Sequence, residues 1–347
     1  MSGPGPKVAL LKADGCGLVA GLPPSIRSAK RCSEELSPSE IVFSCERPSV
    51  FARRWRRQLS GLGVPFRAVS GKPDVGEVAL TLPGDGFPRE GALGAWRPNG
   101  AEPWRPAVGW VPCADDDQAA EAERALCAAL AKDTDGYFAR FDRKLSIALS
   151  LVFLRLPITP NDITTASLAL GLAGAWALAT GTYAVQLAGA VILWFCCILD
   201  GCDGEVARLK LLSSDSGAAY DVAADHVAHV ATFVAIPFAI HRSDPSARFA
   251  LPGALLFSGF LTSMFSVWWL VLRKPESERG PFSLLIERVA SRDYAYLIVA
   301  FAALGKLGWF MWAAAFGSHI FCAALWIAAA RSKPLPNPAA RPVLPRA

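Results

Sequence analysis

The sequence predicts an all-α bundle of six transmembrane helices with a small N-terminal α/β soluble domain, and three observations lead to this fold class. First, 52% of the 347 residues are hydrophobic and 19% are charged, with a mean hydropathy of +0.32. This is too apolar for an ordinary soluble enzyme and for a disordered chain. Second, charged residues recur through residues 1–135 but are missing from long stretches afterwards. Third, β-like and helical patterns alternate only in the N-terminal part.

Residues 1–132 are expected to form the cytoplasmic α/β domain. Strands are predicted within 7–13, 40–46, 65–71 and 77–83, and helices within 48–63 and 117–132. The first of these helices carries a basic run, which we interpret as a solvated face, with contact to anionic lipid as the alternative: Arg53, Arg54, Arg56 and Arg57. Nine cysteines without a CxxC pair indicate reduced, buried thiols. The net charge of +5 and the absence of a basic stripe with interleaved aromatic residues argue against nucleic acid as a partner.

Residues 133–158 are expected to form an interfacial amphipathic helix on the cytoplasmic surface of the membrane. Basic residues lie at its start, and its apolar part is too short to cross a bilayer and ends at Pro157. A plain linker helix is the alternative.

The six-span domain is expected over residues 159–332. No charged residue occurs within 163–199, which is too long for one span and suits two, since a transmembrane helix needs about 20 apolar residues. The expected spans are 162–181, 184–206, 217–240, 249–272, 294–305 and 307–330, of which the fifth is short. Residues 333–347 are rich in proline and are expected to be a disordered tail.

Loop charges predict the orientation in the cytoplasmic (inner) membrane. Lys and Arg are concentrated before the first span, between the second and third, between the fourth and fifth, and in the tail. Basic loops stay in the cytoplasm, so both termini are expected there. The same rule explains Arg273, Lys274, Arg279 and Arg292, with an acceptor phosphate as the alternative ligand of these side chains.

Acidic residues gather where the second and third spans meet. Asp200 and Asp203 are three residues apart on one helix, and Asp221 and Asp225 are four apart on the next, so each pair projects from one face. Carboxylates at membrane depth are costly unless a cation or water compensates them. Four of them suit two Mg²⁺ or Mn²⁺ ions, an arrangement that assists phosphoryl displacement. Two further acids, Glu205 and Asp215, fall outside this register and are expected to be solvated.

The run Asp200-x2-Asp203-Gly204-x2-Ala207-Arg208-x8-Gly217-x3-Asp221-x3-Asp225 resembles the signature of the CDP-alcohol phosphotransferase family, also called CDP-alcohol phosphatidyltransferases. All eight fixed positions are present, and the resemblance covers residues 135–330. It implies that the four Asp bind two Mg²⁺ or Mn²⁺ ions and that Asp225 is also the general base. It further implies that the CDP moiety is cradled by Gly204, Arg208, Ser214 and the segment Thr159, Pro160, Asn161 and Asp162. Plain helix capping, with Asn or Asp as the cap, is the alternative for this segment.

The implied reaction moves a phosphoalcohol group from a CDP-alcohol donor to the hydroxyl of a lipid or polyol acceptor and releases CMP. The donor is either CDP-diacylglycerol or a soluble CDP-polyol such as CDP-inositol. Membrane lipids are expected partners, and a homodimer is among the expected assemblies. An alternative of another class is a transporter whose acids form an ion path, which the full motif argues against.

The junction between the two domains is also similar to a known one. Ala131, Lys132, Asp135, Gly136 and Arg140 resemble the junction in fusions of an inositol-phosphate cytidylyltransferase with a CDP-alcohol phosphotransferase. An active nucleotidyltransferase would carry a glycine-rich loop with a basic residue after its first strand. Residues 13–18 lack that basic residue, so the N-terminal domain is expected to be inactive.

Overall fold

A computed structural model describes residues 6–13, 18–71, 78–95, 109–130, 137–246, 248–273 and 293–331. The chain divides into two compact units. The first comprises Met1–Lys132, Ser146–Asp162 and Cys202–Ala218, and the second comprises Asp133–Leu145, Ile163–Gly201 and Ala219–Ala347. The first unit therefore contains the N-terminal domain together with short stretches at the ends of four long helices, from α5 (Tyr137–Arg155) to α8 (Asp215–Ser243).

The N-terminal domain is built on a parallel four-stranded sheet with the order β3-β2-β1-β4, in which all four predicted strands are confirmed. Its strands are β1 (Lys7–Leu10), β2 (Glu40–Ser44), β3 (Phe66–Val69) and β4 (Leu80–Leu82). A second, antiparallel pair joins β5 (Gly86–Pro88) to β6 (Trp110–Pro112). The strands β1 and β2 are mostly apolar and almost fully buried, as is typical of strands in a parallel sheet.

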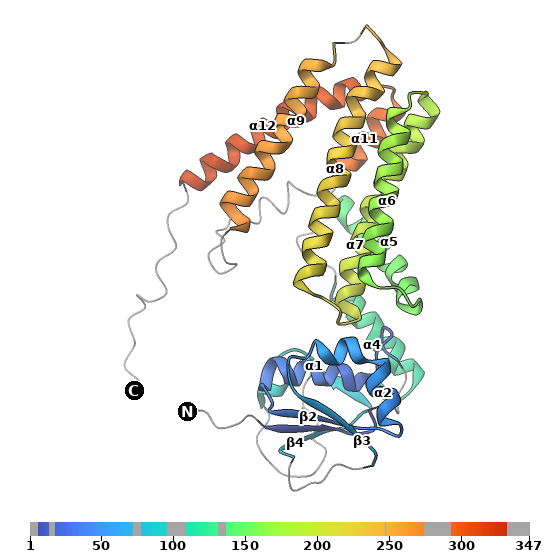
Figure 1. Ribbon diagram of the computed structural model, residues 1–347, viewed down its shortest axis with the longest axis vertical. Coiled ribbons are helices and arrows are strands. Elements are labelled where there is room, and N and C mark those ends of the chain that lie inside the picture. The colour runs from blue at the N-terminus through green and yellow to red at the C-terminus, as the bar shows by residue number, and fades with distance from the viewer. Residues whose placement is uncertain are drawn as a thin grey trace. The chain divides into compact units, whose positions relative to one another are not determined.

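Four helices and a short 3₁₀ turn accompany the sheet (Figure 1). They are α1 (Pro24–Leu36), α2 (Pro48–Arg54), α3 (Arg56–Ser60), α4 (Asp116–Ala128) and the turn η2 (Ala92–Ala95). The predicted helix over 48–63 is thus two short helices that meet at Trp55. The sequence analysis missed α1, because its polar face interrupts the apolar pattern. Leu10, Ile26, Phe43 and Leu80 lie in the core between the helices and the sheet.

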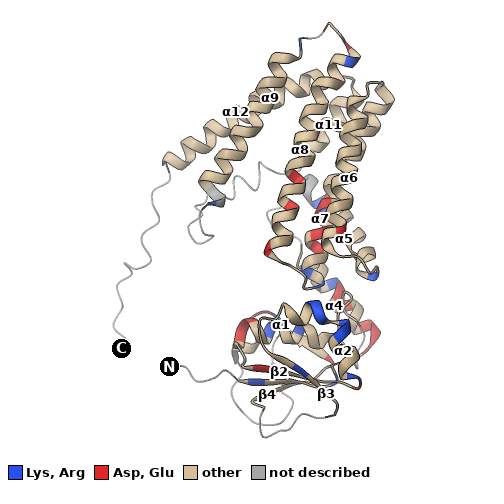
Figure 2. Cartoon of the chain, in the orientation of Figure 1, with Lys and Arg blue, Asp and Glu red and all other residues tan. Residues whose placement is uncertain are grey.

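The remaining helices carry few charged residues along most of their length (Figure 2), and most of them are long. They are α5 (Tyr137–Arg155), α6 (Pro160–Ala179), α7 (Tyr183–Leu209), α8 (Asp215–Ser243), α9 (Ala250–Val267), the π-helical η3 (Trp268–Leu272), α11 (Asp293–Ala303) and α12 (Leu307–Arg331). Within the described residues, five helices are long and apolar enough to cross a membrane, namely α6, α7, α8, α12 and α9 with its extension to Leu270. The apolar helix Tyr294–Ala303 is shorter. Five of the six expected membrane spans therefore correspond to helices that are long and apolar enough to cross a membrane.

The second unit shows the surface of a membrane protein. Large apolar side chains such as Trp176, Phe238, Trp309 and Ile320 are exposed along its helices. Small residues bring its helices close together, because a Cβ atom on Gly189 would lie 2.5 Å from the backbone nitrogen of Leu178. All eight cysteines that the structure describes are free thiols, and most are buried. The predicted Pro-rich tail and the junction residues 131–136 lie outside the described residues.

Candidate active site

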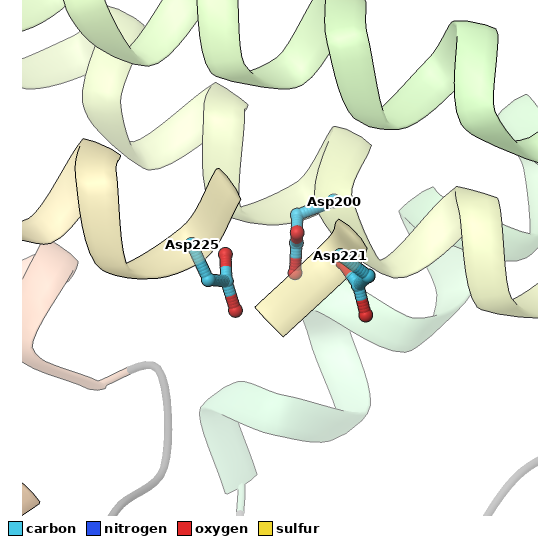
Figure 3. Close-up of side chains that lie close together, drawn as sticks. All are labelled: Asp200, Asp221 and Asp225. Atoms are coloured by element: carbon cyan, nitrogen blue, oxygen red, sulfur yellow. The ribbon is translucent and has the colours of Figure 1, made fainter. Parts of the chain in front are cut away.

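Three of the four predicted metal ligands converge in the second unit (Figure 3). Asp200 lies on α7, and Asp221 and Asp225 lie one turn apart on α8. One carboxylate oxygen from each residue lies within 4.8 Å of the others. Three carboxylates at this spacing repel one another unless a cation neutralises them, and oxygen-only donors suit a hard divalent cation such as Mg²⁺ or Mn²⁺. The donor set therefore fits the expected metal.

Asp203 lies one turn beyond Asp200 on α7 and is 5% exposed. Its carboxylate accepts a short hydrogen bond from the backbone nitrogen of Gly204. The three-residue cluster found among the described residues does not include it.

The segment Thr159, Pro160, Asn161 and Asp162 begins α6 with a reciprocal cap. The Asp162 carboxylate accepts hydrogen bonds from the backbone nitrogen (2.8 Å) and the hydroxyl (2.7 Å) of Thr159. The backbone nitrogen of Asp162 donates to Thr159 Oγ1 at 3.3 Å. This is a capping box with proline at the first helical position. The capping interpretation is therefore confirmed, but it was wrong about the residue, since Thr159 is the cap and Asp162 completes the box.

Ser214 caps α8 in the same way and meets the start of α6. Its hydroxyl accepts a hydrogen bond from the backbone nitrogen of Gly217 at 3.1 Å. A Cβ atom on Gly217 would lie 3.0 Å from Ser214 Oγ and 3.4 Å from Asn161 Oδ1. All three residues belong to the first unit. The N-termini of α6 and α8 therefore lie side by side, and paired helix N-termini favour an anion.

Gly204 gives Arg208 its position on the last turns of α7. A Cβ atom on Gly204 would lie 3.3 Å from Arg208 Nη1, so the missing side chain leaves room for the guanidinium to lie along the helix. Arg208 is exposed and could pair with a phosphate. Both residues belong to the first unit, together with the two helix N-termini.

Glu205 is fully buried, so the expectation that it is solvated was wrong. Its two carboxylate oxygens accept hydrogen bonds from Ser146 (2.6 Å) and Ser150 (2.8 Å) on α5. These hydroxyls compensate the buried carboxylate. The sequence held a signal for this contact, because Ser146 and Ser150 are four residues apart and share one helical face. Asp215 is exposed, as predicted.

The N-terminal domain holds the end of α7 within the first unit, a contact that sequence reasoning missed. The Arg27 guanidinium is 6% exposed and donates to the carbonyl oxygens of Val19 and Leu209, each at 2.8 Å. Gln58 donates to the carbonyl of Lys210 at 3.4 Å. Burial lowers the pKa of Arg27 to about 10, and the group stays charged at neutral pH. The turn that follows Arg208 is thereby attached to the α/β domain.

Comparison with known families covers the stretch that contains all these site residues. Residues 157–319 match the family model described as CDP-alcohol phosphatidyltransferase. These residues form a CDP-alcohol phosphatidyltransferase domain. The predicted family is confirmed, and the match argues against the transporter alternative. Residues 1–132 lie outside it.

Among curated proteins, this chain is similar to several named bifunctional IPC transferase and DIPP synthase. The one from Archaeoglobus fulgidus is 29% identical over 208 residues, which cover 58% of this chain and 40% of that protein. The one from Rubrobacter xylanophilus is 36% identical over 107 residues, covering 30% of this chain and 24% of the relative. A third, from Thermococcus kodakarensis, is 32% identical over 116 residues, 33% of this chain and 26% of the relative. The chain thus matches less than half the length of each.

Proposed function

We propose that the protein transfers a phosphoalcohol group from a CDP-alcohol to an acceptor hydroxyl and releases CMP, in phospholipid or phosphodiester synthesis. The observation that carries the proposal is the convergence of Asp200, Asp221 and Asp225 inside a CDP-alcohol phosphatidyltransferase domain. Family membership supports the reaction class, and the acidic cluster supports its metal dependence.

The roles of the chain's own residues follow from their chemistry. Arg208 and the N-termini of α6 and α8 bind the pyrophosphate of the donor, with Gly204 and Ser214 shaping that surface. Thr159, Pro160, Asn161 and Asp162 present the start of α6 to the nucleotide. Asp225 takes a proton from the acceptor hydroxyl, whose oxygen then attacks the β-phosphorus while the bond to CMP breaks.

The metal site of the proposal consists of all four aspartates. Asp203 is assigned to it by its position in the family motif. A bound divalent cation would supply neutralising charge for the pyrophosphate and the departing CMP. The family is compatible with Mg²⁺ and with Mn²⁺, and the carboxylate set suits both.

A soluble CDP-polyol such as CDP-inositol is the favoured donor, with CDP-diacylglycerol as the second candidate. Two observations favour the polyol: the interdomain junction resembles that of inositol-phosphate cytidylyltransferase fusions, and the curated relatives are named as bifunctional transferases. The acceptor is a lipid or polyol hydroxyl at the membrane. A homodimer remains a prediction.

The N-terminal domain is proposed to make no CDP-alcohol of its own. In a parallel sheet of the order β3-β2-β1-β4, a nucleotide would bind beyond the carboxyl ends of β1 and β4. The segments after these two strands lie close together, because a Cβ atom on Gly84 would collide with the Leu11 carbonyl oxygen. The proposal rests on residues 13–18, which lack the basic residue that a triphosphate-binding loop would carry after the first strand.

The substitution Asp225→Asn tests the reaction and its base. It keeps the shape of the side chain but removes its basicity, so turnover should fall by roughly 10²–10⁴-fold while donor binding falls much less. Asp203→Asn should instead weaken metal and nucleotide binding. CMP formation from CDP-inositol and from CDP-diacylglycerol, measured with Mn²⁺ in nanodiscs, gives the readout, and mass spectrometry identifies the product. Near-normal CMP formation by Asp225→Asn would show that another group activates the acceptor.

A further inference from the structure

A large cavity lies within the first unit. Its volume is about 920 Å³. One wall is formed by α2 and α3, and the opposite wall by the last turns of α5 and the segments that follow α5 and α7. Thr159 is among the residues that line it, but Gly204, Arg208 and Ser214 are not. We call this space the basic cavity, because cationic side chains dominate its lining: Arg53, Arg54, Arg56, Arg57, Arg155 and Lys210.

The cations come from three separate parts of the chain, with Lys210 in the segment after α7. Four are consecutive or nearly consecutive on α2 and α3, and Arg155 ends α5 on the other side. A solvated helix face, as the sequence suggested for the first four, would not place an arginine of a distant helix against them. One lining residue, Glu123, is acidic. Like charges gathered in one concavity raise the local positive potential and attract an anion.

These arginines are available to a ligand. Arg53, Arg56 and Arg155 are exposed, and no carboxylate of the described residues lies within ion-pair distance of them. Arg54 stacks on Trp55, with its guanidinium carbon 5.0 Å from the ring centroid, which orients the group. Lys210 differs, because its ammonium already donates to the carbonyl oxygens of Phe153, Leu156 and Ile158 and so fixes the opposite wall.

The opposite wall is largely apolar. Leu151, Leu154 and Ile158 line it, next to the arginines. A cavity with guanidinium groups on one side and aliphatic side chains on the other suits a phosphate attached to an apolar group. Arginine is well matched to phosphate because its planar fork can donate two parallel hydrogen bonds.

We propose that the basic cavity binds a phosphate-bearing ligand, held by the arginines of α2 and α3 and by Arg155. The ligand is a phosphate ester, supplied either by an anionic lipid headgroup or by a soluble molecule. The α/β domain thereby contributes arginines to a second anion site, which gives it a role that does not depend on nucleotidyl transfer.

The test uses the full chain in nanodiscs with EDTA present, and inorganic phosphate as the first probe. Arg56→Gln and Arg155→Gln come from opposite walls, and each should weaken phosphate binding about tenfold, as expected when one charge-assisted contact is lost. Arg56→Lys keeps the positive charge but loses the planar guanidinium group. Its phosphate affinity should lie between those of Arg56→Gln and the unchanged protein. Arg89→Gln removes an exposed arginine of the same domain outside the cavity and should bind phosphate normally. Melting temperatures without phosphate show that each variant folds.

A second arm separates the two sources of phosphate. Nanodiscs of phosphatidylcholine are compared with nanodiscs that contain phosphatidylglycerol, and native mass spectrometry counts the retained anionic lipid. If the ligand is a lipid, phosphatidylglycerol displaces inorganic phosphate and is lost from Arg56→Gln and Arg155→Gln. If it is soluble, phosphate binds equally in both membranes. The proposal is overturned if neither phosphate affinity nor lipid retention distinguishes these two variants from Arg89→Gln.

Discussion

Gly204 shows how the absence of one side chain can shape an anion-binding surface. Its conformation is ordinary and helical, so backbone freedom does not explain the residue. What explains it is the Arg208 guanidinium, which lies 3.3 Å from the position that a Cβ atom would take. The sequence motif indicated that a small residue belongs here, and the structure gives the physical reason.

Gly204→Ala should therefore weaken donor binding more than it weakens the fold. The added methyl group would displace the Arg208 guanidinium from its position along α7. Displacing this charge-assisted contact is expected to make the free energy of donor binding less favourable by roughly 1–2 kcal/mol. Titration of a CDP-alcohol against the variant in nanodiscs measures this loss. Gly308→Ala is the matched control, because nothing lies within 4 Å of a Cβ atom there and alanine favours the helix. Equal donor affinities in the two variants would contradict this role of Gly204.

The packing of α5 against α7 depends on the buried Glu205 carboxylate as well as on apolar contacts. Glu205 accepts hydrogen bonds from two serines of α5, and Ser150 itself is fully buried. Removing the Ser150 hydroxyl takes one hydrogen-bond donor away from a buried carboxylate, which costs about 1–3 kcal/mol. Ser150→Ala should therefore lower the free energy of unfolding by about that amount.

Thermal unfolding in detergent measures this effect. Ser60→Ala is the control, because its hydroxyl is exposed and bonds only within its own helix end. Glu205→Gln should destabilise less than Glu205→Ala, because the amide oxygen can still accept from one serine. If Ser150→Ala has the same melting temperature as the unchanged protein, the serines do not hold α5 and α7 together.

At the scale of helices and strands, the sequence predicted the features that depend on local residue patterns. It missed the contacts between residues that lie far apart in the sequence. The four strands of the sheet and the long apolar helices follow from hydrophobic periodicity, and Asp200, Asp221 and Asp225 follow from their helical spacing. The burial of Glu205 depends on α5, which lies some fifty residues earlier in the chain. The attachment of Leu209 to Arg27 spans the two domains of the sequence. Neither contact produces a hydrophobic periodicity that could be recognised in the sequence of one helix.

For the whole molecule, the first question is whether the α/β domain performs chemistry. The absence of a basic residue from residues 13–18 predicts that it does not. Purified protein given CTP and inositol phosphate or a sugar phosphate with Mg²⁺ should release no pyrophosphate above background. The transferase assay on the same sample serves as the positive control for folded protein. Metal-dependent pyrophosphate release would show that the domain is a working nucleotidyltransferase.

The second question is how often the chain crosses the membrane, and α11 decides it. That helix has 11 residues and is only about 16 Å long at 1.5 Å per residue, whereas the hydrocarbon core is about 30 Å thick. The basic tail nevertheless favours a cytoplasmic C-terminus, which requires an even number of spans when the N-terminus is inside. The charge pattern thus predicts that the chain around α11 completes a sixth crossing.

Reporter fusions test this topology directly. Fusions at Tyr183, Ser243 and Lys306 should report the outside, and fusions at Lys210 and Glu278 the inside. A fusion after Arg331 discriminates most sharply, because six spans place it in the cytoplasm and five place it outside. This fusion is compared with the fusion at Lys306. If the chain does not cross the membrane at α11, Lys306 lies inside and the end of α12 lies outside. An outside signal after Arg331 with an inside signal at Lys306 would contradict the six-span arrangement, and an inside signal at Ser243 would overturn the orientation of the first three spans.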